Sequence, residues 1–194
     1  FNLGTHFPWI GMRTADLDGE HVEYFRGIRN PIGIKVGPEI TREWLAGLLE
    51  KLNPGREPGR IVLIHRMGEE HIEDKLPPLI RAVQDTGSPV LWISDTMHGN
   101  TESTGDGIKT RRFRKIMNEM ELAFDVHRDN QSRLGGVHLE LTGENVTECT
   151  GGARDLSDED LKRDYKSTVD PRLNYEQSLE MAMLIVGKHS RNAS

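Results

Sequence analysis

The sequence predicts an α/β protein with a parallel sheet, because short apolar strands alternate with amphipathic helices along its 194 residues. Five runs rich in β-branched or other apolar residues begin at positions 5, 33, 61, 90 and 137, so their starts are 28, 28, 29 and 47 residues apart. A repeat of this length fits one strand, one helix and their connections. Successive βα units of this kind place neighbouring strands parallel to one another.

The predicted strands cover residues 5–10, 33–36, 61–64, 90–93 and 137–141, and the segments between them have apolar residues at helical spacing. Thr41 is a typical N-cap for the second helix. Pro77 and Pro78 are expected to open the third helix, and Gly87 to follow its end. The apolar positions that define the helices are Val22 and Phe25; Trp44, Leu45, Leu48, Leu49 and Leu52; Leu79, Ile80 and Val83; Phe113, Ile116, Met117, Met120 and Phe124; and Leu179, Met183 and Val186.

Two architectures are built from such units. An open Rossmann sheet is one, but no G-x-G-x-x-G follows a predicted strand here. A closed (β/α)₈ TIM barrel is the other, and it needs eight strands and about 250 residues. If the chain forms part of a barrel, residues 1–194 are a single domain that supplies about strands 4 to 8, and the N-terminal strands come from elsewhere. The longest loops are expected at residues 95–110 and 144–170.

Composition argues against several classes of protein. Lys and Arg number 25 against 31 Asp and Glu, and a net charge of 25 − 31 = −6 argues against a general nucleic-acid binder. No run of about 18 apolar residues would span a membrane, and no signal peptide is visible. The single cysteine, Cys149, fits a reducing, cytoplasmic location. Because the first residue is Phe1 rather than Met, we expect the natural N-terminus to lie upstream.

Three cations occupy the same position in successive βα units. Arg13 follows the first predicted strand, Lys35 lies within the second, and Arg66 follows the third. In parallel α/β proteins, the carboxyl ends of the strands carry the chemistry. Any one of these side chains alone would be an ordinary solvated residue. Three at one sheet edge, beside glycines, predict a site for phosphate or carboxylate groups.

A second set of polar residues falls at the same edge. His98 follows the fourth predicted strand, His138 and Glu140 lie two apart on the fifth, and Asp170 precedes the last helix. His98, Glu140 and Asp170 form a mixed nitrogen and oxygen set that suits Mn²⁺, Fe²⁺, Co²⁺ or Zn²⁺. Their spacing is not a compact metal motif, and a lone histidine is more often a hydrogen-bonded structural residue.

Other candidate sites are weaker. The basic run Arg111-Arg-Phe-Arg-Lys115 is expected to be a solvated helix start. Asn145 lies in a glycosylation sequon, which without a secretion signal is a chance match. Cys149 has no basic neighbour in sequence, so we expect a buried and inert thiol.

Six strings of the sequence, in register, carry a family resemblance. They are Trp9-Ile-Gly-Met-Arg-Thr14, Asn30-Pro-Ile-Gly-Ile-Lys-Val-Gly-Pro38, His65-Arg-Met-Gly68, Met97-His-Gly-Asn-Thr101, Gly136-Val-His-Leu-Glu-Leu-Thr-Gly-Glu-Asn-Val-Thr-Glu-Cys149 and Asp170-Pro-Arg-Leu-Asn174. The chain resembles class II DAHP synthases (3-deoxy-D-arabino-heptulosonate 7-phosphate synthases) over essentially its whole length. The resemblance implies a (β/α)₈ barrel and a transferase that condenses phosphoenolpyruvate with erythrose 4-phosphate, the first step of the shikimate pathway.

The resemblance also implies roles for the residues already singled out. His98, Glu140 and Asp170 look like three of the four metal ligands of the family, with Mn²⁺ the metal expected first. Arg13, Lys35 and Arg66 look like its phosphoenolpyruvate-binding cations, and Lys35, Arg66 and His98 are expected to be catalytic. The fourth ligand of the family is a cysteine on the first strand, which this sequence lacks. Cys149 matches a different family position.

Three positions depart from the family pattern. Met12 replaces an acidic residue, and Ser94 and Thr96 replace a cysteine and a proline next to His98. The changes leave open an amino-sugar analogue of the reaction, as in an amino-DAHP-type synthase of secondary metabolism. Another metal-dependent aldolase and a non-catalytic fragment or subunit are further alternatives.

The isolated chain is expected to be inactive. Five strands of a barrel leave two open edges, at which Phe7, Trp9 and Ile10 and, on the other side, Val137, Leu139 and Leu141 lose their neighbours. We therefore expect a homo-oligomer, or a requirement for an N-terminal barrel segment, with no nucleic-acid or membrane partner.

Overall fold

The protein has a five-stranded parallel sheet, which confirms the predicted α/β class. The structure, a computed structural model, describes residues 4–192. The strands lie in the order β1-β2-β3-β4-β7, and each adjacent pair is parallel. Their bounds are β1 Trp9–Ile10, β2 Ile32–Val36, β3 Ile61–His65, β4 Val90–Ser94 and β7 Leu134–Val137.

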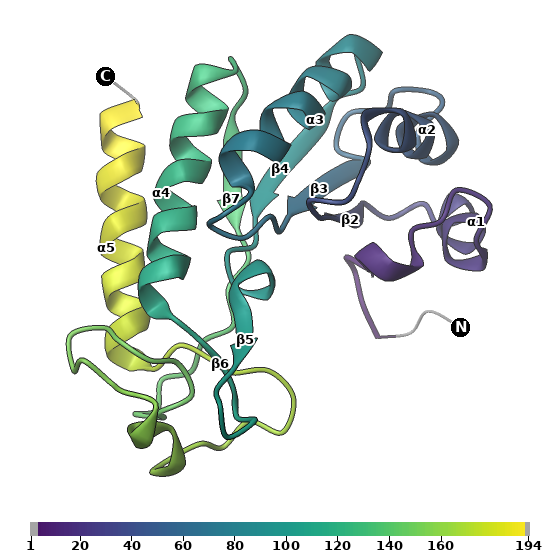
Figure 1. Cartoon of the computed structure of the whole chain (residues 1–194). Coiled ribbons are helices and arrows are strands. Elements are labelled where there is room, and N and C mark those ends of the chain that lie inside the picture. The colour runs from purple at the N-terminus through teal and green to yellow at the C-terminus, as the bar shows by residue number, and fades with distance from the viewer. Residues whose placement is uncertain (1–3, 193–194) are drawn as a thin grey trace.

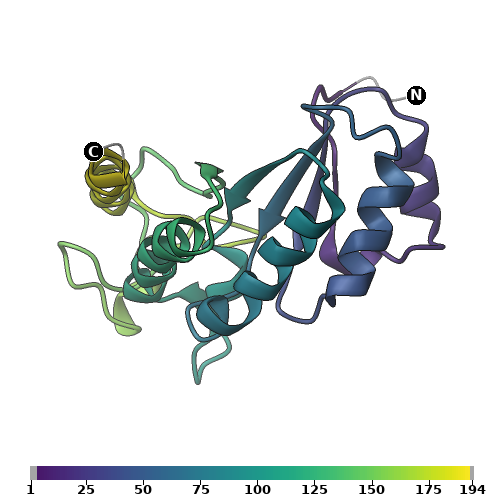
Figure 2. The same ribbon diagram turned by 90° about the horizontal axis from the view of Figure 1, so that it is seen from above.

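Five α-helices follow one another in an arc along one face of this sheet (Figures 1 and 2). They are α1 Glu20–Arg26, α2 Arg42–Leu52, α3 Ile72–Thr86, α4 Phe113–Asp129 and α5 Tyr175–Asn192. Each helix contacts the next in the chain. A twisted parallel sheet with helices on one face fits part of a (β/α)₈ barrel. That these strands are the fourth to the eighth stays a prediction.

The long segments expected as loops contain short elements. An antiparallel hairpin of β5 (Thr101–Ser103) and β6 (Lys109–Arg111) occupies the first of them. The second contains the short helix η3 (Glu159–Lys162). Two further 3₁₀ turns, η1 (Met12–Thr14) and η2 (His98–Asn100), follow β1 and β4 directly. Both therefore lie at the carboxyl edge of the sheet.

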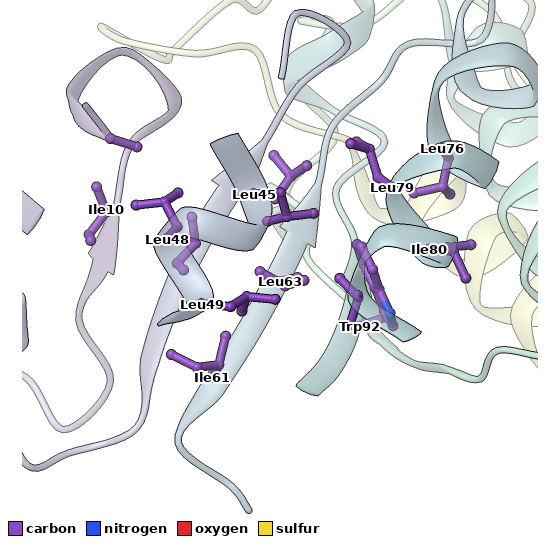
Figure 3. Packing of buried hydrophobic residues seen from close by; sticks show 14 of the residues in the cluster. Ile10, Leu45, Leu48, Leu49, Ile61, Leu63, Leu76, Leu79, Ile80 and Trp92 are labelled. Atoms are coloured by element: carbon purple, nitrogen blue, oxygen red, sulfur yellow. The ribbon is translucent and has the colours of Figure 1, made fainter. Parts of the chain in front are cut away.

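The main core fills the space between the sheet and helices α2 and α3 (Figure 3). Every residue of β2 and β3 is buried. Leu45, Leu48 and Leu49 of α2 are inaccessible to solvent, and each such burial contributes about 1.5–3 kcal/mol. Thr41 caps α2 as predicted, its hydroxyl oxygen accepting a hydrogen bond from the Trp44 backbone N–H. The core thereby fixes the strands whose ends carry the predicted site.

The predicted start of the third helix was wrong. Helix α3 begins at Ile72, so Pro77 and Pro78 lie inside it rather than at its first turn. Each proline removes one N–H from the helix. Ile72 and Leu76 are nevertheless completely buried, so packing on the sheet outweighs the lost hydrogen bonds. Gly87 ends the helix in the left-handed conformation, as expected.

The first and last strands also differ from the prediction. Strand β1 has two residues instead of the six expected at 5–10, and the last strand, expected at 137–141, lies at Leu134–Val137. Gly135 and Gly136 hid this strand, because glycine has low strand propensity. A Cβ at Gly135 would lie 2.3 Å from Leu91 Cδ1, so the Leu91 side chain on β4 would have to move to admit a larger residue. As a consequence, His138 and Glu140 follow the strand at its carboxyl end.

The residues predicted to lose their neighbours at the sheet edges differ in exposure. Leu141 is 52% exposed but lies beyond the end of β7, and Val137 and Leu139 are partly buried against a second core cluster. On β1, Trp9 is 49% exposed and its ring lies 5.7 Å from that of His138, whereas Ile10 is 1% exposed. Ile10 is covered because it belongs to the main core cluster. On α5, the exposed apolar residues are Tyr175, Leu179, Met183 and Val186. Within residues 4–192, no helix is long and apolar enough to cross a membrane.

Candidate active site

The predicted site residues converge on the carboxyl edge of the sheet. Each belongs to a different βα connection or strand end: Arg13 to η1, Lys35 to β2, and His98 to η2. A cavity of about 430 Å³ at this edge is lined by Arg13, Lys35, Arg66, His98, Lys109 and Asp170, among others. Glu140 lies beside the cavity, in contact with His98.

His98, Glu140 and Asp170 form a cluster that fits a divalent metal. His98 Nε2 lies 3.4 Å from Glu140 Oε1 and 3.8 Å from Asp170 Oδ2. One ligand atom from each of the three residues lies within 4.8 Å of the others. Metal–ligand bonds of about 2.1 Å place neighbouring ligand atoms roughly 3–3.5 Å apart, so small side-chain adjustments suffice for binding.

A second atom of each potential ligand is held by another side chain. Asp95 Oδ2 lies 2.8 Å from His98 Nδ1, which leaves Nε2 facing the cluster. Arg111 Nη1 donates to Glu140 Oε2 at 2.5 Å, and Lys109 pairs with Asp170 Oδ1. Groups of this kind fix the orientation of metal ligands. The donor set and its supports together fit a metal centre.

The electrostatics of the cluster favour a positive charge at its centre. The hydrogen bond to Asp95, helped by Glu140, raises the pKa of His98 to about 9. Burial opposes ionisation of Glu140, but His98 and Arg111 lower its pKa to about 2. Burial likewise opposes ionisation of Asp95, yet His98 and Lys35 hold its pKa far below the usual value. The carboxylates therefore hold either a proton on His98 or a cation between them.

The cationic side of the cavity is next to this cluster. Lys35 is buried, and its Nζ donates to Asp95 Oδ2 at 2.5 Å. Arg66 Nη2 donates to the backbone carbonyl of His98 at 2.7 Å. Within the described residues, neither Arg66 nor Arg13 forms an ion pair with a carboxylate. Both guanidinium groups are thus available to an anion that enters the cavity.

Met12, which replaces an acidic family residue, lies beside this cationic side. Its sulfur lies 4.0 Å from Arg66 Nη1. The sulfur also lies against Gly37, where a Cβ would be only 2.0 Å away. An acidic residue at position 12 would therefore bring its side chain close to Arg66.

Asp95, Lys109 and Arg111 belong to the site but were missed in the sequence. Arg111 was expected to be solvated, and this was wrong: its side chain is completely buried. Thr101, Glu140 and the carbonyl of Pro171 accept its hydrogen bonds. Asp95 could have been found from the sequence, because it lies only three residues before His98 and can therefore reach its imidazole. Arg111 carried no such signal, because its partners are 10 to 60 residues away.

Cys149 takes no part in the site. It is completely buried. Burial raises the pKa of its thiol to about 12. The expected burial of this thiol is therefore confirmed, and its raised pKa agrees with the prediction that it is inert.

The fold and site define a class of protein: a parallel α/β protein whose sheet edge carries a cavity lined by cationic side chains, beside residues that could hold a divalent metal. Comparison with known sequences identifies the family. A sequence model described as the class-II DAHP synthetase family matches residues 1–186. The chain belongs to this family.

Curated relatives carry the corresponding name. The phospho-2-dehydro-3-deoxyheptonate aldolase AroG of Mycolicibacterium smegmatis is 49% identical over 185 residues, which are 95% of this chain and 40% of the relative. The phospho-2-dehydro-3-deoxyheptonate aldolases of Neurospora crassa and Streptomyces coelicolor are 49% and 47% identical, over 95% of this chain and 39% and 41% of their own lengths. The chain spans about two fifths of the length of these relatives.

Proposed function

We propose that the chain carries the metal-binding and anion-binding part of a DAHP synthase active site. The complete enzyme would condense phosphoenolpyruvate with erythrose 4-phosphate to give DAHP and phosphate. The single observation that carries this proposal is the meeting of two residue sets at one sheet edge. Arg66 donates to the backbone of His98, and Lys35 and His98 share the carboxylate of Asp95.

The three cations suit phosphoenolpyruvate, which has both a phosphate and a carboxylate group. Arg13 and Arg66 each offer a planar fork that binds two oxygens of such a group, whereas Lys35 offers a point charge. Lys35 is already oriented by Asp95. Groups fixed before the substrate arrives align it for reaction without further ordering. They would also stabilise the charge on the departing phosphate.

His98, Glu140 and Asp170 would hold the divalent metal, for which we propose Mn²⁺, with Co²⁺, Fe²⁺ or Zn²⁺ as alternatives. When bound, such an ion supplies Lewis-acid polarisation of the erythrose 4-phosphate aldehyde. In the reaction, C3 of phosphoenolpyruvate bonds to the aldehyde carbon, water adds at C2, and phosphate leaves. The cations keep the enolpyruvyl group in place throughout.

We also propose that a preceding segment of about three strands completes the barrel and contributes the fourth metal ligand. Among the described residues, β1 and β7 each have a neighbouring strand on one side only, and the outer face of α5 is apolar. Both features support this proposal. The chain alone would then be inactive and self-associated. A cytoplasmic location is part of the same proposal, based on the single buried cysteine.

Phosphoenolpyruvate binding tests the proposed function. Calorimetric titration of Arg66→Ala and Lys35→Ala in the complete enzyme should show losses on the order of 2–4 kcal/mol, as for a desolvated charge pair. Lys35→Arg should also bind phosphoenolpyruvate poorly, because a planar guanidinium does not replace the ammonium group that Asp95 holds. Arg56→Ala, at an exposed cation on the α2–β3 loop, is the matched control and should bind normally. Unchanged affinity in the Arg66 and Lys35 variants would contradict the proposal.

A further inference from the structure

A buried carboxylate outside the cavity connects the two loops that carry Arg66 and His98. Glu119 lies on α4 and is inaccessible to solvent. Its Oε1 accepts hydrogen bonds from the backbone N–H groups of Met67 at 3.1 Å and Gly68 at 2.9 Å. Its Oε2 accepts one from Asn100 Nδ2 at 2.6 Å. Glu119 therefore binds the two residues that directly follow Arg66. It also binds Asn100, which lies two residues after His98 in the other loop.

The amide of Asn100 has only one orientation that satisfies its surroundings. Its Nδ2 also donates to the carbonyl of Thr96 at 2.8 Å, and its Oδ1 accepts from the Glu69 backbone N–H at 3.1 Å. A flipped amide would face Thr96 with an acceptor and Glu69 with a donor. The group facing Glu119 is thus a donor, and the position of Oε2 requires an acceptor.

The two loops that Glu119 connects also touch each other, at a pair of glycines. Gly68 has a φ of +83°, and a Cβ on it would lie 2.8 Å from the Gly99 carbonyl oxygen. A Cβ on Gly99 would lie 2.4 Å from the Gly68 nitrogen. Arg66 and the His98 carbonyl form a further hydrogen bond across the same boundary. A shift of one loop is therefore transmitted to the other.

We propose that Glu119 is a positioning residue, which fixes the distance between the anion-binding Arg66 and the metal ligand His98. It touches neither substrate nor metal and acts through the backbone of Met67 and Gly68 and through Asn100. The roles of Arg66 and His98 in this statement rest on the proposed function. The connection between the loops does not.

Glu119→Gln tests the proposal, with Glu121→Gln as the matched control. Gln retains the shape but presents an N–H₂ group to either Asn100 or the two backbone donors. Glu121 lies two residues further on the same helix and is exposed, and among the described residues its ion-pair partner is Lys188, at 3.7 Å. Measurements at pH 8 keep Glu119 ionised, since burial raises its pKa to about 7.

Hydrogen exchange measured by mass spectrometry on the 194-residue chain reports the exchange rates of the backbone amides in both loops and does not require enzyme activity. In Glu119→Gln, peptides covering residues 66–71 and 96–102 should exchange at least about fivefold faster, as expected for the loss of a buried hydrogen bond. Peptides from β2 and α2 should be unchanged, as should all peptides of Glu121→Gln. Equal acceleration everywhere, or unchanged loops, would overturn the proposal.

Exchanging the two groups provides a rescue that a merely structural role would not give. Asn100→Asp alone places two carboxylates face to face and should weaken phosphoenolpyruvate binding by the complete enzyme about 10-fold or more, as Glu119→Gln should. In the double variant, the amide introduced at position 119 can donate to the carboxylate introduced at position 100. The carbonyl of Thr96 still loses its donor, because Asn100 Nδ2 is gone. The double variant should therefore bind more tightly than Asn100→Asp alone, with a loss smaller than the sum of the two single losses.

Additive losses in the double variant would overturn the proposal. If the wild-type enzyme does not bind phosphoenolpyruvate but the exchange pattern is as expected, the proposed function fails and the connection between the loops stands.

Discussion

The carboxyl edge of the sheet and the outer face of α5 differ in whether their side chains have partners within the chain. At the sheet edge, His98, Glu140 and Asp170 each have a second group that holds them. On α5, Tyr175, Leu179, Met183 and Val186 are 46% to 65% exposed. The difference teaches that polar side chains at the sheet edge find partners within the described chain, whereas apolar side chains on this face of α5 are left open to solvent.

Helix α5 makes this contrast clear because it is apolar on two sides. Met181 is completely buried in the second core cluster, where Leu184 and Ile185 also pack. The opposite side carries Met183 and Val186, each 65% exposed. An amphipathic surface helix has one apolar stripe, and contiguous exposed apolar residues mark an interaction site. This pattern supports the proposed segment that would cover α5.

The largest expected effect is the gain of activity when that segment is supplied. The N-terminal part of the Mycolicibacterium smegmatis relative, joined to this chain, should release phosphate from phosphoenolpyruvate and erythrose 4-phosphate, whereas the chain alone should not. The reason is that the joined segment would provide the missing strands and cover α5. A phosphate-release assay on both proteins makes the comparison. Full activity of the chain alone as a monomer would show that five strands suffice.

Metal binding tests the carboxyl edge of the sheet, where His98, Glu140 and Asp170 lie. His98→Ala should abolish the binding of Mn²⁺ that calorimetry detects, because it removes the nitrogen ligand. Asp95→Asn should weaken binding about 10-fold, since Asp95 orients the imidazole. Asp125→Asn, at a half-buried carboxylate of α4 that pairs with Lys188 and Arg128, is the control and should leave binding unchanged. Identical Mn²⁺ affinity in His98→Ala would remove this residue from the site.

Self-association of the chain tests the exposed apolar face of α5. Met183→Lys should shift the isolated chain toward the monomer in sedimentation velocity, because a charge on an apolar contact opposes its burial. Ser190→Lys adds the same charge at an exposed polar position of α5 and should have little effect. If both variants associate as the wild type does, α5 is not the contact surface.

The smallest effect concerns pH in the metal-free chain. The pKa of His98 is raised from 6.5 to about 9, so its charged form stabilises the folded state fully below pH 6.5. This contribution is lost as the pH rises through about 9. Urea unfolding from pH 7 to 9.5 should therefore show a larger decline for the wild type than for His98→Gln. Parallel pH profiles would contradict the charge assignment. Because the proton and the metal compete for the same nitrogen, Mn²⁺ should also bind more tightly toward pH 9.

The sequence predicted well where the candidate site residues lie when their position depends on local pattern. Lys35 lies near the end of a strongly apolar strand, Arg66 and His98 follow such strands, and these strands formed where expected. Arg111 was misjudged because its burial depends on Glu140 and Pro171, which approach only in the folded chain. The last strand was predicted at residues 137–141 but lies at Leu134–Val137, because Gly135 within it packs against Leu91 of a neighbouring strand. Local sequence therefore predicts strand ends, whereas the groups that support the site are set by tertiary packing.

The most direct test of the central claim is to locate Mn²⁺ by anomalous X-ray scattering in crystals of the chain soaked with Mn²⁺ and phosphoenolpyruvate. The account predicts one anomalous peak bonded to His98 Nε2 and to carboxylate oxygens of Glu140 and Asp170. Phosphoenolpyruvate should lie beside it, in contact with Lys35 and Arg66. A bound Mn²⁺ elsewhere, with these three side chains unliganded, would contradict the claim that this chain carries the arranged metal site of the enzyme.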